Sequence, residues 1–211
     1  MTPVPTSLDH LVYATPSFGR TLDDIEATFG VRPLAGGTHP AWGTRNAILP
    51  LSPTTYLELI GPDPGRSPGA RPLIFGLATL AAPRLVTWAA KGTHLGLLVA
   101  KALTRGIRLG LPTPGTRQRP DGTILNWELT DPLQVAESGP VPFFIDWGTS
   151  PHPAGDAPAT VTLTDFHAEH PDPEGLRSKL RALGLDLRIE PGSQASLVAT
   201  FRTPRGLATL R

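Results

Sequence analysis

The sequence predicts an α+β protein built from repeated βαβββ modules, in which a strand and a helix are followed by three more strands. Two observations predict this architecture. A strand, a helix and a terminating glycine occur together three times, and the glycines Gly30, Gly106 and Gly184 are separated by 76 and 78 residues. An aliphatic residue that can begin the next strand follows each glycine. Because a repeat of this length is typical of an array of α+β modules, we expect three of them.

The first module is expected over residues 1–62. Residues 8–14, LDHLVYA, alternate around a β-branched and aromatic centre, which predicts a strand that carries His10. An amphipathic helix follows, because apolar residues at offsets 0, 4, 7 and 11 share one face, and Gly30 can close the last turn. The apolar residues of this face are Phe18, Leu22, Ile25 and Phe29.

Three strands complete the first module. An irregular one is predicted within residues 31–37, and two more over residues 44–52 and 54–62. Ser52-Pro53 is a turn signal between the last two strands, so we expect them to form a hairpin. The final strand carries Glu58 among apolar residues.

The second module, residues 63–148, repeats the order with a longer hairpin, and we expect it to pair with the first. Its predicted elements are a strand at 84–90, a helix within 93–106, an extended segment at 108–120, a turn at Asp121-Gly122 and strands at 123–130 and 141–148. Its aromatic residues, with three of the four tryptophans of the chain, predict a large packed barrel.

A linker over residues 149–159 and a shorter third module make up residues 149–211. Asp172 is a predicted helix N-cap, followed by Pro173 at the first helical position. His167 and His170 precede this helix. Residues three apart on a strand point to opposite faces, so these histidines do not form a metal pair, and we expect both to be solvent-exposed.

Composition fits an ordinary globular protein. Of 211 residues, 39% are hydrophobic and 18% charged. The formal net charge is +1 and the 19 basic residues are scattered, so neither nucleic acid nor an anionic membrane surface is an expected partner. No window approaches the roughly 18 apolar residues of a membrane span, and the first ten residues do not resemble a signal peptide. We therefore expect a cytoplasmic protein.

Several chemistries are absent from the sequence. There is no cysteine, which excludes disulfides, thiolate metal sites and a cysteine nucleophile. The chain also lacks a phosphate-binding glycine loop, a nucleophile elbow and the HExxH zinc motif. These absences favour small-molecule binding or metal-assisted chemistry.

With His10 on the first strand and Glu58 on the last strand of a βαβββ unit, the chain resembles the vicinal oxygen chelate superfamily, and within it the glyoxalase-like group. The resemblance is carried by LDHLVYATP, HPAWGTRNAIL, YLELIGPDP, RPDGTILNWELT, VPFFIDWG and FRTPRG. It implies an open barrel of the glyoxalase, bleomycin-resistance and dioxygenase type, in which paired modules enclose a cavity that holds a divalent metal. A homodimer is an alternative arrangement, because modules of this kind also pair across chains.

The resemblance makes His10 and Glu58 metal ligands for zinc, nickel, manganese or iron, with Glu58 as ligand or catalytic base. In the second module the position that matches His10 falls near Val86, and the one that matches Glu58 falls at Ile145 or Asp146. A one-residue change of register moves a side chain to the other face of a strand, so alternation alone does not decide between these two.

Seven further residues are candidates for contact with a ligand. A guanidinium, an amide and an indole can bind a small carboxylate or amide together, whereas aromatic residues on strands are also common core residues. The candidates, in chain order, are Trp42, Arg45, Asn46, Trp88, Arg117, Trp127 and Asp146. Arg45 has the alternative of pairing with a buried acid, and Trp42 that of closing the barrel.

Two functions follow from these observations. By resemblance, the protein binds and transforms a small oxygenated metabolite, as a metal-dependent lyase, isomerase or dioxygenase. The alternative is a metal-free binding or sequestering protein of the resistance type, which the thin set of metal ligands in the second module favours.

Overall fold

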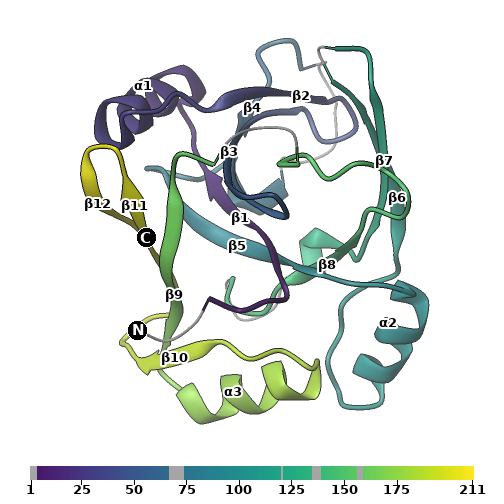
Figure 1. The fold of residues 1–211 in the computed structure, drawn as a ribbon. Coiled ribbons are helices and arrows are strands. Elements are labelled where there is room, and N and C mark those ends of the chain that lie inside the picture. Colours follow the sequence, from purple (N-terminus) through teal and green to yellow (C-terminus); the bar gives the residue numbers. More distant parts are fainter. Residues whose placement is uncertain (1–3, 67–73, 120, 135–138, 156–158) are drawn as a thin grey trace.

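The fold is seen in a computed structural model, which describes residues 4–66, 74–119, 121–134, 139–155 and 159–211 (Figure 1). Within these residues the chain forms twelve β-strands, three α-helices and two short 3-10 turns. The helices and strands follow the predicted α+β order. No helix of the described residues is long and apolar enough to cross a membrane.

The first two βα units each continue into three strands. The first contains β1 (Leu8–Ala14), α1 (Phe18–Phe29), β2 (Leu34–His39), β3 (Thr44–Ser52) and β4 (Thr55–Pro62). The second contains β5 (Arg84–Lys91), α2 (Leu95–Leu103), β6 (Thr113–Gln118), β7 (Ile124–Leu129) and β8 (Phe143–Asp146), with 3-10 turns at Ile74–Gly76 and Pro132–Gln134. Gly30 closes α1 in the left-handed conformation, with φ of 75°, as predicted.

These strands make one curved sheet of eight, in the order β2-β3-β4-β1-β5-β8-β7-β6. Its two halves have the same internal order, because β1 lies parallel to β4 and β5 lies parallel to β8. An antiparallel pairing of β1 with β5 joins the halves, and the edge strands β2 and β6 approach each other across the opening (Figure 1). The predicted α+β open barrel is therefore confirmed.

The seam between β1 and β5 contains two register shifts, one beside Asp9 and one beside Val86. Such β-bulges turn successive side chains out of strict alternation and bend the strand. Residues two apart on a regular strand share one face. Because of the bulge, Leu8 instead packs in the outer core while His10 lines the inner side of the sheet. The bulges thus help decide which side chains reach the interior of the barrel.

The remaining elements form a second sheet, which packs against the outer face of the first. They are β9 (Thr162–His170), α3 (Pro173–Ala182), β10 (Arg188–Pro191), β11 (Ser196–Thr203) and β12 (Gly206–Leu210). The sheet order is β10-β9-β11-β12, so here the first strand pairs with the strand directly after the helix and not with the last one. The topology of this sheet therefore differs from that of the first two units.

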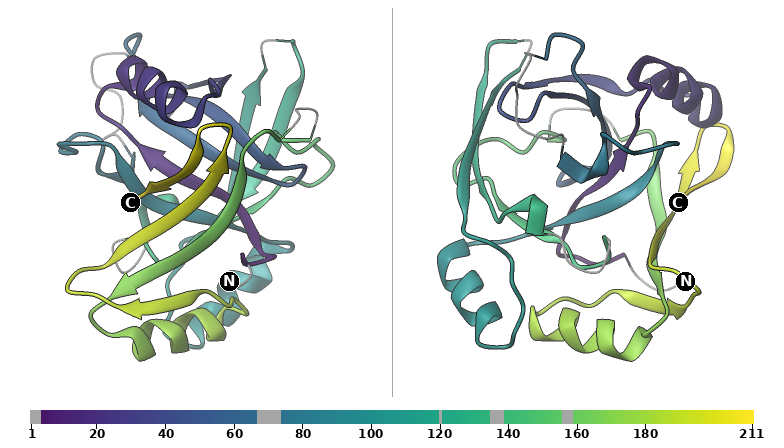
Figure 2. Two further views of the ribbon diagram at one scale, coloured as in Figure 1. Left: turned by 60° about the vertical axis from the view of Figure 1, so that its left-hand side comes forward. Right: turned by 180° about the vertical axis from the view of Figure 1, so that it is seen from behind.

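Aromatic side chains join the two sheets. Figure 2 shows the C-terminal strands lying across β1 and β5, and the ring of Phe166 meets Trp88 edge-on at 5.6 Å between centroids. Phe201 packs 5.3 Å from Phe29 of α1. At the start of α3, the side chain of Asp172 accepts a hydrogen bond from the backbone N–H of Gly175, which confirms the predicted N-cap.

The prediction of solvent-exposed His167 and His170 is wrong, because each side chain is buried, with 8% of the residue exposed. β9 extends to His170, so both lie on a strand that pairs on both sides. Nδ1 of His167 lies 2.7 Å from the carboxylate of Asp165, and Nδ1 of His170 lies 3.0 Å from the backbone nitrogen of Asp172. Polar partners from β9 and from the N-terminus of α3 replace water around these rings.

Candidate functional site

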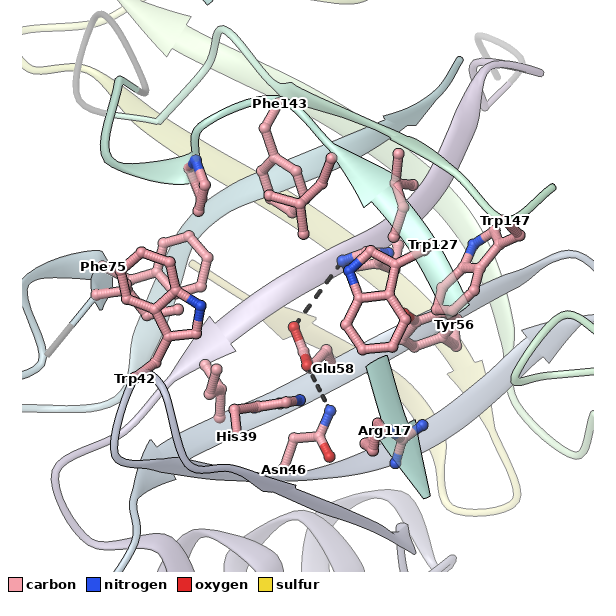
Figure 3. Close-up of a pocket in the computed structure, with 16 residues that line it drawn as sticks. His39, Trp42, Asn46, Tyr56, Glu58, Phe75, Arg117, Trp127, Phe143 and Trp147 are labelled. Atoms are coloured by element: carbon pink, nitrogen blue, oxygen red, sulfur yellow. Dashed lines mark hydrogen bonds and ion pairs between the residues drawn. The ribbon is translucent and has the colours of Figure 1, made fainter. Parts of the chain in front are cut away.

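A cavity lies inside the curve of the eight-stranded sheet and includes about 600 Å³ of empty space up to its open mouth (Figure 3). Both halves of the sheet line it. Its apolar wall is mainly aromatic, with Trp42, Phe75, Trp127, Phe143 and Trp147. An apolar wall with a few polar groups that face the same space is typical of a small-molecule site.

Glu58 projects into this cavity from β4. Only 8% of the residue is exposed, and its Oε1 accepts a hydrogen bond of 2.5 Å from Nδ2 of Asn46 on the neighbouring strand β3. The two residues face each other because Ile48 is the direct partner of Glu58, and Asn46 lies two residues further along the same face. Asn46 thus fixes one carboxylate oxygen and leaves the other toward the cavity.

His10 lies beside this carboxylate, with its Nε2 3.9 Å from Oε2 of Glu58. The opposite ring nitrogen, Nδ1, is 2.8 Å from Oδ1 of Asp9, a residue that is 1% exposed. Asp9 also accepts a hydrogen bond from Nε1 of Trp147 at 3.2 Å and lies 3.4 Å from Nε2 of His152. Asp9 therefore anchors three side chains behind the cavity wall.

The charge state of Asp9 determines which nitrogen of His10 carries a proton. Burial disfavours the Asp9 carboxylate, but hydrogen bonds and positive charge from His10 and His152 outweigh burial and hold its pKa well below the usual range. An ionised carboxylate only accepts hydrogen bonds, so Nδ1 of His10 is the donor to Asp9.

Two other residues of the cavity are held in their neutral forms. Burial, followed by the negative charges of Glu58 and Asp9, raises the pKa of Tyr56 well above its usual value, so its hydroxyl keeps its proton. Burial lowers the pKa of His39, against the charge of Glu58. Tyr56 and Glu58 are two residues apart on β4 and share its inner face.

The second half of the sheet supplies N–H donors. Arg117 on β6 and Trp127 on β7 line the cavity, and within the described part of the chain both Nη1 of Arg117 and Nε1 of Trp127 are buried without a hydrogen-bond partner. Glycines make room for both side chains. A Cβ atom on Gly37 would lie 2.9 Å from the Arg117 side chain, and one on Gly115 would lie 2.3 Å from the indole of Trp127.

Six of the predicted site residues line the cavity: His10, Trp42, Asn46, Glu58, Arg117 and Trp127. The other three, Arg45, Trp88 and Asp146, do not. Arg45 lies on the face of β3 opposite to Asn46. Its guanidinium carbon is 4.5 Å from the centroid of the Phe18 ring of α1. Among the described residues, the contact of this guanidinium is therefore with an aromatic ring on the outside of the sheet.

Trp88 and Asp146 lie outside the cavity for reasons of register. Trp88 is fully buried in the outer core, where Nε1 donates a 2.9 Å hydrogen bond to the carbonyl of Pro140. The bulge beside Val86 reverses the alternation of β5 before Trp88. In β8 it is Ile145 that faces the cavity, while Asp146 accepts a hydrogen bond from the backbone of Gly148.

Sequence reasoning missed Asp9, Trp147 and His152. Asp9 reaches the back of His10 because of the bulge in β1, which strict alternation does not predict. His152 comes from the segment predicted to be a linker, and its ring packs 5.5 Å from Tyr56 and 5.8 Å from Trp147. A histidine among prolines and glycines gave no signal for this role.

The donor set does not fit the divalent metal that the sequence resemblance implies. Among the residues that the structure describes, no group of three or more His, Cys, Asp or Glu side chains could hold a metal ion. His10 and Glu58 supply two donor atoms, and one oxygen of Glu58 already accepts from Asn46. The second half of the sheet adds Ile145, Arg117 and Trp127, which are apolar groups and N–H donors and do not coordinate cations.

Comparison with known proteins supports the fold. A family profile described as a glyoxalase-like domain matches residues 8–184. A hypothetical protein from Staphylococcus aureus superimposes with a TM-score of 0.68 at 13% identity, over 90% of this chain and 87% of that chain. No curated protein matches the sequence.

Weaker likenesses are found to methylmalonyl-CoA epimerases. The enzyme from Mycobacterium tuberculosis has a TM-score of 0.44 at 18% identity, over 69% of this chain and 89% of that chain. The Streptomyces coelicolor enzyme, in complex with 2-nitronate-propionyl-CoA, has a TM-score of 0.48 at 18% identity, over 71% of this chain and the whole of that chain.

Proposed function

The chain belongs to the glyoxalase-like domain family, and on this premise we propose that its cavity binds a small oxygenated metabolite from which Glu58 removes a proton. The proton comes from a carbon next to a carbonyl group of the ligand. The reaction class is isomerisation or elimination through an enolate. The single observation that carries the proposal is the carboxylate of Glu58, buried in an aromatic cavity with one oxygen fixed by Asn46.

The environment of Glu58 suits a general base. A carboxylate that is held in one orientation and shielded from water meets a C–H bond with little loss of entropy. When the proton moves to Oε2 of Glu58, the electron pair of the C–H bond forms a carbon–carbon double bond, and negative charge develops on the carbonyl oxygen of the ligand. Return of the proton to the opposite face of the carbon inverts its configuration, which is the isomerisation, whereas return to the original face restores the ligand.

Tyr56 is the donor that we assign to the developing oxyanion. Its hydroxyl keeps its proton, because burial raises its pKa, and it lies on the same face of β4 as Glu58. A neutral O–H donor that faces an oxyanion in an apolar cavity is an effective stabiliser of the transition state. His10 lines the cavity beside Glu58, with Nε2 3.9 Å from Oε2, and Asp9 holds the opposite nitrogen of the His10 ring.

A second candidate is a metal-free binding protein without turnover. The aromatic wall favours it, because Trp42, Trp127 and Trp147 provide apolar contact area whether or not a proton is transferred. The two candidates agree on ligand binding and differ on the fate of the proton.

Hydrogen–deuterium exchange at the carbon next to a carbonyl separates them. The probes are 4-phenyl-2-butanone, 2-oxobutanoate and phenylpyruvate, followed by proton NMR in deuterium oxide, with tryptophan fluorescence quenching as the measure of binding. We expect exchange above the rate in buffer for at least one probe, and a decrease of about 100-fold or more in Glu58→Gln without loss of binding. Glu128→Gln, an exposed site on β7, is the matched control and should keep the wild-type rate.

Other outcomes have definite meanings. Probes that quench fluorescence but do not exchange in the wild type identify a binding protein. Exchange that disappears after treatment with EDTA and returns with zinc, nickel, manganese or iron would contradict the metal-free mechanism and support metal-assisted chemistry at His10 and Glu58.

A further inference from the structure

We infer that the ligand of the cavity carries a carboxylate, and that Arg117 and Trp127 bind this group. The inference rests on the proposed function of the same cavity, because it names the chemical class of the ligand. It starts from two buried N–H groups of the cavity wall, Nη1 of Arg117 and Nε1 of Trp127, for which the residues that the structure describes provide no hydrogen-bond partner.

Arg117 is a buried cation, with 7% of the residue exposed. Burial lowers its pKa, but a guanidinium stays protonated at neutral pH, so the positive charge remains inside the wall. The nearby acid, Glu58, has its hydrogen-bonded oxygen directed to Asn46. A buried charged donor without a partner is costly, and this cost is removed when an anion fills the cavity beside it.

Trp127 lies on the same face of the β6–β7 hairpin as Arg117. Gly115 is the direct cross-strand partner of Trp127, and Arg117 is two residues further along β6, so the two side chains are diagonal neighbours. Diagonal neighbours on a sheet are about 7–8 Å apart at their Cα atoms, a distance over which an arginine and a tryptophan can bind the same small group. Their free N–H groups can therefore converge on one carboxylate.

The glycines of the edge strands support this geometry. The side chain of Arg117 lies against Gly37 of β2, and the indole of Trp127 lies over Gly115 of β6. A side chain at either glycine would displace the donor beside it. The two glycines thus make room for both donors. Among the described residues, neither Nη1 of Arg117 nor Nε1 of Trp127 has a hydrogen-bond partner.

A carboxylate fits this pair of donors better than a neutral group. A guanidinium matches the two oxygens of a carboxylate, and hydrogen bonds between charged groups are stronger than those between neutral ones. The remaining wall, which includes Trp42, Phe75 and Phe143, suits an apolar or aromatic body. The expected ligand is a small carboxylic acid whose apolar part faces these rings.

Three carboxylates, each paired with its primary amide, test the inference through tryptophan fluorescence titrations. The probes are phenylacetate, 3-phenylpropanoate and 4-methyl-2-oxopentanoate. For at least one pair we expect the wild type to bind the acid tenfold or more tightly than the amide. Arg117→Gln should abolish this preference, Arg117→Lys should keep part of it, and Trp127→Phe should weaken the acid severalfold. Arg108→Gln, which removes an exposed positive charge, is the control and should change nothing.

Thermal unfolding of each variant shows whether it remains folded. If Arg117→Gln does not fold, the comparison uses Arg117→Lys, which retains the positive charge. The inference is overturned if no acid binds more tightly than its amide, or if folded Arg117→Gln keeps the preference.

These outcomes are separate from those of Glu58→Gln, because exchange on the neutral ketone 4-phenyl-2-butanone does not need a carboxylate. Glu58→Gln should also bind the acids at least as tightly as the wild type, since it removes a like charge from the cavity.

Discussion

Replacement of Asp9 by asparagine tests the polar anchor behind the cavity. The carboxylate of Asp9 meets two donors, Nδ1 of His10 at 2.8 Å and Nε1 of Trp147 at 3.2 Å, and it also lies 3.4 Å from Nε2 of His152. An asparagine keeps one acceptor oxygen but presents an NH₂ group to the remaining donor. A hydrogen bond to a buried charge contributes about 1.5–3 kcal/mol, and the loss of one partner from a buried charged cluster costs about 3–5 kcal/mol. We therefore expect Asp9→Asn to lower the free energy of unfolding by about 2–4 kcal/mol at pH 7.

The same substitution should change the pH dependence of stability. The pKa of Asp9 is held below its usual range in the folded protein, so its stabilising effect is complete above about pH 5. Below about pH 4 the unfolded chain takes up a proton at this residue while the folded chain does not, and the effect decreases. The difference in stability between wild type and Asp9→Asn should therefore become smaller as the pH falls from 7 to 3.

Urea unfolding followed by tryptophan fluorescence at several pH values measures both effects. Asp186→Asn, an exposed aspartate, is the matched control and should remain within about 0.5 kcal/mol of the wild type. The reasoning is refuted if Asp9→Asn is as stable as this control at pH 7. It is equally refuted if the difference between wild type and variant is the same at pH 3 and pH 7.

Two further substitutions test the placement of tryptophans on either side of the sheet. Gly115→Ala should displace the indole of Trp127, lower stability by about 1–3 kcal/mol and weaken ligand quenching, as measured by unfolding and fluorescence titration. Trp88→Phe loses the hydrogen bond to Pro140 and leaves space between the sheets, so it should cost about 1–3 kcal/mol but leave ligand affinity unchanged. A loss of affinity in Trp88→Phe would contradict its place in the outer core.

Periodicity in the sequence was sufficient to predict the main elements of the fold. The repeated strand, helix and glycine predicted the two βαβββ halves. The family resemblance singled out Glu58 on the last strand of the first half, and in the structure this residue lies on the inner face of β4. Helix signals were equally clear, because the Asp172 cap and the Gly30 stop depend on local backbone chemistry. The third unit was predicted as a repeat, but its sheet order depends on tertiary pairing that no local pattern reveals.

Strand register is the common physical cause of the differences between the expected and the observed positions of side chains at the site. Bulges beside Asp9 and Val86 shift the alternation of β1 and β5, which brings Asp9 to His10 and moves Trp88 to the outer core. A bulge adds one residue to one strand and leaves no mark in composition. For Asp146, two registers were equally compatible with the sequence, and the structure has Ile145 on the inner face.

The two halves of the sheet share a topology but contribute different chemistry. The inner face of β4 carries Tyr56 and Glu58, whereas the inner face of β8 carries Phe143 and Ile145. A metal centre that takes ligands from both halves needs donor atoms on both strands, and here only the first half provides them. The second half instead contributes Arg117 and Trp127 to the cavity wall, and Nη1 and Nε1 of these side chains have no hydrogen-bond partner among the described residues. An acceptor on one wall and donors on the other suit a ligand that releases a proton at one end and carries negative charge at the other.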